Sequence, residues 1–265
     1  MNLKQEAEFF HYIAPKVREL VLNYDGHAPV AAYKARPGDY ATEIDVAAEN
    51  LIVSEIQKRF PTDTILAEEG HTGTVISDSR IWIIDPICGT ANLGRGMKNF
   101  CSNIALADKG ELIAACVVDH SQEDYLWSVG NNRAYINDKV IENVSRDESF
   151  GLVIDVDLGA VSDIPKSERK KCTDVILQLV LQPEVMLQSL NSSLSFAYVA
   201  SGKVDGFINV ANHPWDICAG SFLIQQSGGI ITDLVGKPWQ LNSVGAIGAV
   251  NKAVHKKLLH AYSEA

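Results

Sequence analysis

The chain lacks the features that mark a membrane-spanning or a nucleic-acid-coating protein. No apolar run approaches the roughly 18 residues that a membrane-spanning helix needs. Basic residues are in the minority, because 23 Lys and Arg face 33 Asp and Glu and leave a net charge of −10. That charge disfavours non-specific binding to nucleic acid or to an anionic membrane. It also repels phosphate esters, so a phosphate site here would need local cations, most simply metal ions.

Cysteine is scarce and irregularly spaced. The five cysteines form no CxxC pair, which disfavours a zinc site or a redox couple of that type. Reduced thiols in a cytoplasm are the simplest interpretation. Residues 1–10 mix Lys4, Glu6 and Glu8 with apolar residues, which predicts the start of an amphipathic helix and no signal peptide. We therefore expect a cytoplasmic protein.

The first half of the chain, residues 1–150, predicts two helices and a mostly antiparallel sheet. Apolar residues recur at helical spacing over 3–24 and 43–60. Pro15 is expected to kink or divide the first helix. Short apolar segments that predict strands lie at 64–67, 81–84, 104–107, 112–118, 125–128 and 134–136. The two helices are expected to cover one face of this sheet.

The second half, residues 151–265, alternates between strand and helix patterns. Strands are expected at 152–156, 206–210, 230–233 and 246–250. Helices are expected at 166–182, 192–201, 214–227 and 251–262. The boundary between the halves is expected near residues 145–151. Because 46% of the residues are hydrophobic, a sizeable core is possible, and we expect the two halves to form one compact unit.

One segment joins a buried strand to a sharp turn: Trp82-Ile83-Ile84-Asp85-Pro86-Ile87-Cys88-Gly89-Thr90. The apolar run predicts the strand, and the proline and glycine that follow it predict the turn. A carboxylate at a strand end is well placed to bind a hard cation such as Mg²⁺, and Thr90 offers a hydroxyl nearby. Taken alone, Asp85 is more readily explained as a solvated acid at the end of a strand, and only the surrounding motif favours a metal ligand.

This segment resembles the Asp-Pro-Ile-Asp-Gly-Thr signature of the inositol monophosphatase family of Mg²⁺-dependent phosphatases. Cys88 stands at the place of an aspartate in that signature. Segments 39–45, 67–70 and 214–220 resemble three further motifs of the family, in the same order. The resemblance therefore covers nearly the whole chain. It implies an α/β fold in a layered αβαβα sandwich, and a cytoplasmic homodimer.

The resemblance also implies a phosphomonoesterase. Its substrate would be a small phosphate ester, an inositol phosphate or a sugar phosphate, hydrolysed by attack of a metal-activated water. The implied metal ligands are Glu68, Asp85, the carbonyl group of Ile87, and Asp216. Asp45 and Thr90 would orient the attacking water, and Glu68 also belongs to the implied catalytic set. The implied cofactor is Mg²⁺, with Mn²⁺ or another divalent ion as an alternative.

The residues implied to bind phosphate or the rest of the substrate are Cys88, Gly89, Thr90, Asn191 and Asn209. Free N–H groups around Gly89 and Thr90 would bind phosphate oxygens. Two departures from the family weaken the case for inositol phosphate itself. Asn209 stands where the family commonly has a glutamate, and Leu190-Asn191-Ser192-Ser193 replaces Gly-Ser-Ala-Ala. The second segment serves equally well as a helix cap. Fructose-1,6-bisphosphate and a 3′-phosphonucleotide are alternative substrates.

Cys88 is the departure with the largest chemical consequence. A thiol is mostly protonated at pH 7, and a soft sulfur is a poor ligand for Mg²⁺. The chain could be a weakened or altered phosphatase, or its site could take a softer ion such as Mn²⁺ or Zn²⁺. It could also be a catalytically silent binding or regulatory protein on the same scaffold. The presence of both Asp45 and Thr90 favours the enzyme, since a pure binding protein needs no water-orienting pair.

Three charged residues near these motifs have simpler interpretations. Asp39 follows Pro37-Gly38, where it would cap a turn. Lys34 could approach an anionic site, but it is interpreted as a solvated lysine. Glu69 is expected to face solvent or to support the site without binding metal.

Overall fold

The structure, a computed structural model, describes residues 2–24, 29–34, 40–76, 78–142, 151–157, 166–211 and 213–265, except for the side chains of 166–168. Asp39 and residues 143–150, on which most of the expected boundary falls, lie outside these ranges. The division into residues 1–150 and 151–265 therefore stays a prediction. In the described part of the chain, no helix is long and apolar enough to cross a bilayer.

Helices α1 (Lys4–Leu22) and α2 (Glu43–Arg59) form the first layer. They pack on each other and bury their apolar faces against the large sheet. The expected division at Pro15 is wrong, since α1 runs through it as one helix, and a kink there stays a prediction. Phe10 and Val17, on either side of the proline, are fully buried, and this packing outweighs the hydrogen bond that proline cannot donate.

The second layer is a seven-stranded sheet in the order β3-β4-β5-β6-β7-β8-β9. Its strands are β3 (Thr64–Ala67), β4 (Ile81–Cys88), β5 (Cys101–Asp108), β6 (Glu111–Asp119), β7 (Asp124–Ser128), β8 (Tyr135–Ile136) and β9 (Lys139–Val140). Only β3 and β4 pair in parallel, so the expected mostly antiparallel sheet is confirmed.

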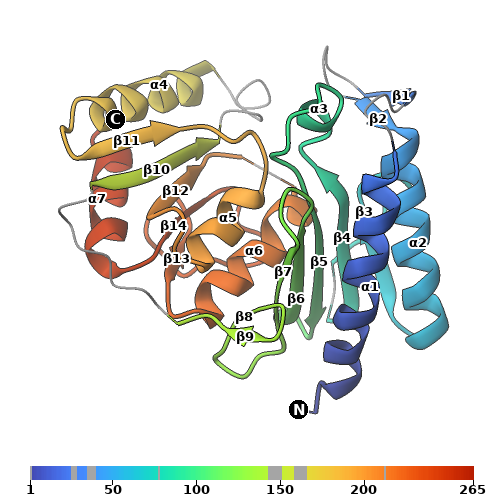
Figure 1. The fold of residues 1–265 in the computed structure, drawn as a ribbon. Helices are drawn as coiled ribbons and strands as arrows, with labels where there is room; N and C mark the ends of the chain where they lie inside the picture. The colour runs from blue at the N-terminus through green and yellow to red at the C-terminus, as the bar shows by residue number, and fades with distance from the viewer. Residues whose placement is uncertain are drawn as a thin grey trace.

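The remaining layers come from the second half of the chain. A five-stranded sheet has the order β11-β10-β12-β14-β13. Its strands are β10 (Leu152–Asp157), β11 (Val185–Gln188), β12 (Gly206–Asn209), β13 (Ile230–Thr232) and β14 (Ala246–Ala249). Between the two sheets lie α5 (Leu194–Ala200) and α6 (Pro214–Gln226). The outer layer consists of α4 (Lys166–Val180) and α7 (Lys252–Ser263). Figure 1 shows the resulting αβαβα sandwich, as the resemblance implies.

Small elements complete the described fold, and the sequence patterns did not indicate them. A hairpin of β1 (Val30–Tyr33) and β2 (Tyr40–Thr42) lies beside α2, and the single-turn helix α3 (Thr90–Leu93) follows β4. Strands β9 and β11 were also missed. Each of these elements has four residues or fewer, and none has a regular apolar alternation, so periodicity carries little signal for them. The hairpin and α3 both border the candidate site.

Candidate active site

The end of β4 carries the signature segment, and its backbone is irregular. The expected strand, 81–84, continues to Cys88, and its pairing with β5 shifts register between Asp85 and Cys88. Such a bulge re-aims side chains at the end of a strand. Gly89 follows with a φ of 101°, and a Cβ there would lie 2.8 Å from the carbonyl oxygen of Asn99. Glycine is therefore required at the turn that starts α3 at Thr90.

Asp85 is a fully buried carboxylate that has no donor. Among the described residues, neither of its carboxylate oxygens has a hydrogen-bond partner. Burial, and then the neighbouring Cys88, Glu68 and Asp216, raise the pKa of Asp85 well above its usual value. An ionised acid in these surroundings is costly unless a cation neutralises it. The residues around Asp85 therefore fit a divalent cation.

Asp45 and Thr90 are in direct contact, as their implied shared role requires. The hydroxyl of Thr90 lies 2.7 Å from Oδ1 of Asp45 and 3.0 Å from the carbonyl oxygen of Ile87. The other carboxylate oxygen of Asp45 accepts hydrogen bonds from the backbone N–H of Thr42, at 2.8 Å, and from the Thr42 hydroxyl. Burial raises the pKa of Asp45 in spite of these bonds. The contacts fix the carboxylate at the start of α2.

Asp216 approaches the same site from α6. Its Oδ2 accepts the backbone N–H of His213 at 3.0 Å, which caps the helix. Its Oδ1 lies 3.9 Å from Sγ of Cys88. Burial, followed by repulsion from Glu68, raises the pKa of Asp216 to about 7. One ligand atom each from Asp85, Cys88 and Asp216 lies within 4.8 Å of the other two. The fold thus brings Cys88 and Asp216 into contact, although they are 128 positions apart in the sequence.

Glu68 directly follows β3 and forms an ion pair with a lysine in this structure. Nζ of Lys34 lies 2.5 Å from Oε1 of Glu68 and 2.8 Å from Oε1 of Glu69. Burial lowers the pKa of Lys34, but the attraction of Glu68 and Glu69 outweighs it and raises the pKa overall. The interpretation of Lys34 as a solvated residue is wrong, because the hairpin of β1 and β2 brings it to the carboxylates. Nothing in the sequence pattern indicated this hairpin.

The segment before α5 donates hydrogen bonds to both the sulfur and the carbonyl oxygen of Cys88. The backbone N–H of Ser193 donates to Sγ of Cys88 at 3.1 Å, and the hydroxyl of Ser192 donates to the Cys88 carbonyl oxygen at 3.0 Å. Cys101 lies directly across the strand pair from Cys88. The hydrogen bond with Cys101, and then burial, raise the pKa of Cys88 well above its usual value. Sequence reasoning assigned no such role to Ser193 or Cys101.

The two asparagines proposed for substrate binding occupy different environments. Asn209 is buried at the end of β12, where its Nδ2 donates to Oδ2 of Asp157 at 2.8 Å and its Oδ1 has no partner in the described structure. Asn191 has an exposed side chain, and its carbonyl oxygen lies 3.3 Å from Nδ2 of Asn92. Substrate binding by either asparagine stays a prediction, as do the roles of Gly89 and Cys88.

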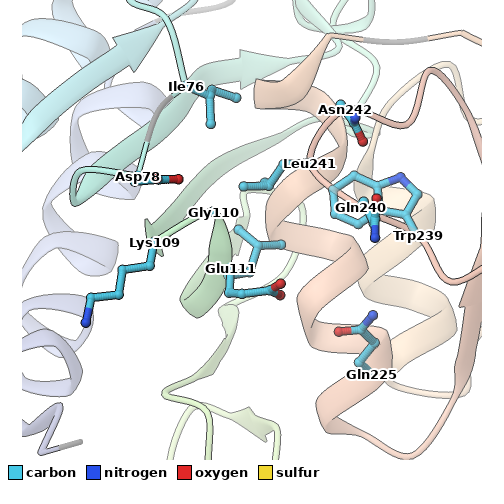
Figure 2. A pocket seen from close by; sticks show the side chains of 11 residues that line it. Ile76, Asp78, Lys109, Gly110, Glu111, Gln225, Trp239, Gln240, Leu241 and Asn242 are labelled. Carbon is cyan, nitrogen blue, oxygen red and sulfur yellow. The ribbon is translucent and has the colours of Figure 1, made fainter.

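A pocket of about 390 Å³, which Figure 2 shows from close by, is lined by other residues. It is bordered by the turn between β5 and β6, the end of α6 and the segment between β13 and β14. The indole N–H of Trp239 is buried there without a partner in the described structure. No residue of the implied metal or catalytic set lines this pocket. It is therefore distinct from the candidate active site.

Comparison with known proteins agrees with the fold and the motifs. The sequence pattern of the inositol monophosphatase family matches residues 5–265. A Thermotoga maritima fructose-1,6-bisphosphatase/inositol-1-monophosphatase is 31% identical over 253 residues, which cover 94% of this chain and 92% of the relative. The Nus factor SuhB of Salmonella typhimurium is 30% identical, over 89% of this chain and 87% of the relative. The solved structure of a Thermotoga maritima IMPase superposes with a TM-score of 0.84 at 28% identity, covering 98% of this chain and 97% of the other. The chain belongs to the inositol monophosphatase family and is a metal-dependent phosphatase of small phosphate esters.

Proposed function

We propose that the protein is a Mg²⁺-dependent phosphomonoesterase whose active site is the cluster of acids around the end of β4. The observation that carries this proposal is the buried Asp85, whose two carboxylate oxygens have no partner in the described structure. Glu68, Asp85 and the carbonyl group of Ile87 would hold one ion, because all three offer the oxygen ligands that Mg²⁺ prefers. Asp216 would close a second position beside Asp85 and Cys88.

The metal, when bound, would act as a Lewis acid that activates water and neutralises charge on the phosphoryl group. The chain's own contribution begins with Asp45 and Thr90. Hydrogen bonds from Thr42 hold one oxygen of Asp45, and the other faces the hydroxyl of Thr90 at 2.7 Å. This pair would orient the attacking water and accept its proton through the Thr90 hydroxyl. Positioning of this kind removes much of the entropic part of the barrier.

The backbone at Gly89 and Thr90 would bind the phosphate oxygens. N–H groups in the first turn of a helix have no acceptor within the helix, and they favour anions. Gly89, with its φ of 101°, starts this helix four residues after Asp85. Asn191 and Asn209 would contact the organic part of the ester. An inositol phosphate or a sugar phosphate is the proposed substrate, and the name of the Thermotoga maritima relative supports both kinds.

A substrate screen tests this proposal. The full chain would be assayed against inositol, sugar and nucleotide phosphates with Mg²⁺ and Mn²⁺ in parallel, and Asp85→Asn would serve as the inactive control. We expect Mg²⁺-dependent release of phosphate from at least one inositol or sugar ester, and none from the control. Equal release by the parent and Asp85→Asn would overturn the site assignment.

A second candidate function is a regulatory role on the same scaffold. The relatives named Nus factor SuhB support it, and so does the sulfur of Cys88 among the acids. This role requires no turnover, so it predicts that Asp45→Asn and Thr90→Ala leave it intact. The screen separates the two functions, because a regulatory protein without turnover releases no phosphate from any ester.

We further propose a homodimer formed through the edge of the five-stranded sheet. Strand β11 lies at this edge, next to the end of α4. Four large apolar side chains are more than half exposed there: Leu177, Val180, Leu181 and Met186. Exposed clusters of this kind mark interaction surfaces, and a sheet edge offers unpaired backbone groups to a second copy. A cytoplasmic location remains an expectation from the reduced cysteines.

A further inference from the structure

We infer that Asp85, Cys88 and Asp216 form a site for a thiophilic divalent cation of the Zn²⁺ type, next to an all-oxygen Mg²⁺ site that shares Asp85. This inference rests on the proposed function and concerns the same centre. One ligand atom from each of the three residues lies within 4.8 Å of the other two. Asp85 adds an independent observation, because it is fully buried and both its oxygens lack a partner in the described structure.

The donor set distinguishes zinc from magnesium. Mg²⁺ requires oxygen ligands, and a thiolate binds it poorly. Zn²⁺ is borderline soft and takes sulfur and carboxylate oxygen together. Catalytic zinc sites typically have three protein ligands and leave one position open for water or substrate. Asp85, Cys88 and Asp216 supply one sulfur and two carboxylates, which matches this ligand number.

Two contacts fix the donor atoms of Cys88 and Asp216. The backbone N–H of Ser193 donates to Sγ of Cys88 at 3.1 Å and holds the sulfur beside Asp216. The helix cap at His213 fixes Asp216, so that Oδ1 remains on the side of Cys88. Contacts that orient a ligand in this way strengthen metal binding.

The second group of ligands has no sulfur. Glu68 and the carbonyl oxygen of Ile87 are hard donors, and with Asp85 they suit Mg²⁺. In this structure Lys34 forms an ion pair with Glu68. The two positions therefore differ in chemistry, and Asp85 belongs to both. A centre with one Mg²⁺ and one Zn²⁺ follows from this arrangement.

X-ray absorption at the zinc edge tests the inference without any assay of activity. The full chain would be stripped with a chelator, loaded with one equivalent of Zn²⁺ alone, and measured. We expect a single sulfur in the first shell at about 2.3 Å and oxygen donors in the remaining positions. A shell of oxygen or nitrogen atoms without sulfur would overturn the inference. This measurement uses the unmodified protein, so it does not depend on the folding of a variant.

Two matched variants identify the sulfur. Cys88→Ser should lose the sulfur shell and bind Zn²⁺ at least tenfold more weakly, because even a change in the surroundings of a ligand costs about 10–100-fold in affinity. Cys101→Ala, across the strand pair, should keep the sulfur shell. A sulfur shell that persists in Cys88→Ser, or that is lost only in Cys101→Ala, would contradict the assignment.

The outcomes separate this inference from the proposed function. Phosphatase activity with Mg²⁺, together with a zinc shell that contains only oxygen, would overturn the zinc site and leave the phosphatase. A zinc–sulfur shell without phosphate release from any ester under any metal would keep the site and overturn the phosphatase as proposed. Added Zn²⁺ should not be displaced from the intact protein by a tenfold excess of Mg²⁺, whereas Cys88→Asp should exchange it.

Discussion

Asp45 and Asp216 occupy the same position in two different helices, since each is the third residue of its helix and caps the start with one carboxylate oxygen. In α2 the capped group is the N–H of Thr42, and in α6 it is the N–H of His213. The second oxygen faces Thr90 in one case and Cys88 in the other. Each cap therefore serves two purposes, because it stabilises a helix and aims a carboxylate at the site.

The first prediction concerns Asp45→Asn. The amide still accepts a hydrogen bond at the start of α2, but it cannot take a proton from water through Thr90. We expect kcat to fall by about 10²–10⁴, the usual contribution of a positioned acid or base. The stability should change little, since helix-end charges contribute only about 0.3–1 kcal/mol. Rate measurements at saturating substrate, with thermal unfolding alongside, check both statements.

Glu43→Gln is the matched control for Asp45→Asn. Glu43 is an exposed acid in the same first turn of α2 and has no contact with Thr90 in the described structure. The control should keep parental kcat. An equal loss in both variants would assign the effect to the helix and not to the site.

The second prediction concerns Asp85→Asn. Loss of this carboxylate should abolish metal-dependent activity, because both proposed metal positions use it. Without metal the variant should be more stable than the parent, since it removes a buried charge next to Glu68 and Asp216. A gain of 1 kcal/mol would raise Tm by about 2–4 °C in a chain of this size.

Calorimetry with and without Mg²⁺ checks this prediction. The parent should gain stability on adding Mg²⁺, because a ligand that binds only the folded state stabilises it. Asp85→Asn should gain none. A Mg²⁺-induced rise in Tm equal to that of the parent would show that the ion binds elsewhere.

Most of the fold could be predicted from the sequence because its long elements follow a clear apolar periodicity. Strand β3 lies at 64–67, as expected, and α2 and α6 end within one residue of their expected bounds. The misses, β11 and α3 among them, are short or have an irregular pattern, and tertiary packing sets their conformation. The helix is not divided at Pro15, because the burial of its apolar face outweighs the hydrogen bond that proline cannot donate.

The candidate site was less predictable than the fold. Motifs identified Glu68, Asp85 and Asp216, but no local pattern indicates that Lys34 reaches Glu68 or that Ser193 donates to Cys88. The second of these contacts joins residues 105 positions apart, through the segment that precedes α5. Such contacts depend on how the two sheets pack, and a sequence examined by itself carries no direct signal for that.

The third prediction concerns Cys88→Asp. A third carboxylate supplies a hard oxygen ligand beside Asp85 and Asp216, so apparent Mg²⁺ affinity should rise by at least about tenfold, or 1.4 kcal/mol. Turnover on a screened ester should rise as well if the sulfur limits Mg²⁺ binding. The metal-free protein should be less stable, because the added charge repels its neighbours. A Mg²⁺ titration of rate for both proteins checks this, and unchanged affinity would show that position 88 does not face the metal.

The fourth prediction concerns the exposed apolar cluster at β11 and α4. Leu181→Glu places a charge on a side chain that is 73% exposed, so the monomer should remain folded. If this face forms the homodimer, the charge should raise the dimer dissociation constant by tenfold or more. Light scattering coupled to gel filtration measures the mass. Val235→Glu, at a similarly exposed site between β13 and β14, is the control and should leave the mass unchanged.

The fifth prediction concerns His120, which contacts the bulge of β4 through the hydroxyl of Ser102. The hydroxyl of Ser102 donates to the carbonyl oxygen of Pro86 at 2.5 Å, and Nε2 of His120 lies 2.8 Å from the same hydroxyl. The single proton of the hydroxyl is used for Pro86, so Nε2 acts as the donor to the hydroxyl oxygen. Burial, and then repulsion from Arg18, lowers the pKa of His120 to about 3.

The pH dependence of stability follows from that lowered pKa. Above about pH 6.5 the histidine is neutral in both the folded and the unfolded chain, so its titration does not change the free energy of unfolding there. Between pH 6.5 and pH 3 only the unfolded chain takes up the proton, and the folded state loses about 1.4 kcal/mol for each unit that the pH falls. His120→Gln keeps an N–H donor for Ser102 but does not titrate. Its free energy of unfolding should therefore decline less steeply than that of the parent between pH 6 and pH 4, although it starts lower at pH 7. Urea unfolding at a series of pH values measures both slopes. Parallel slopes would mean that His120 is protonated in the folded protein and that the bulge is held in another way.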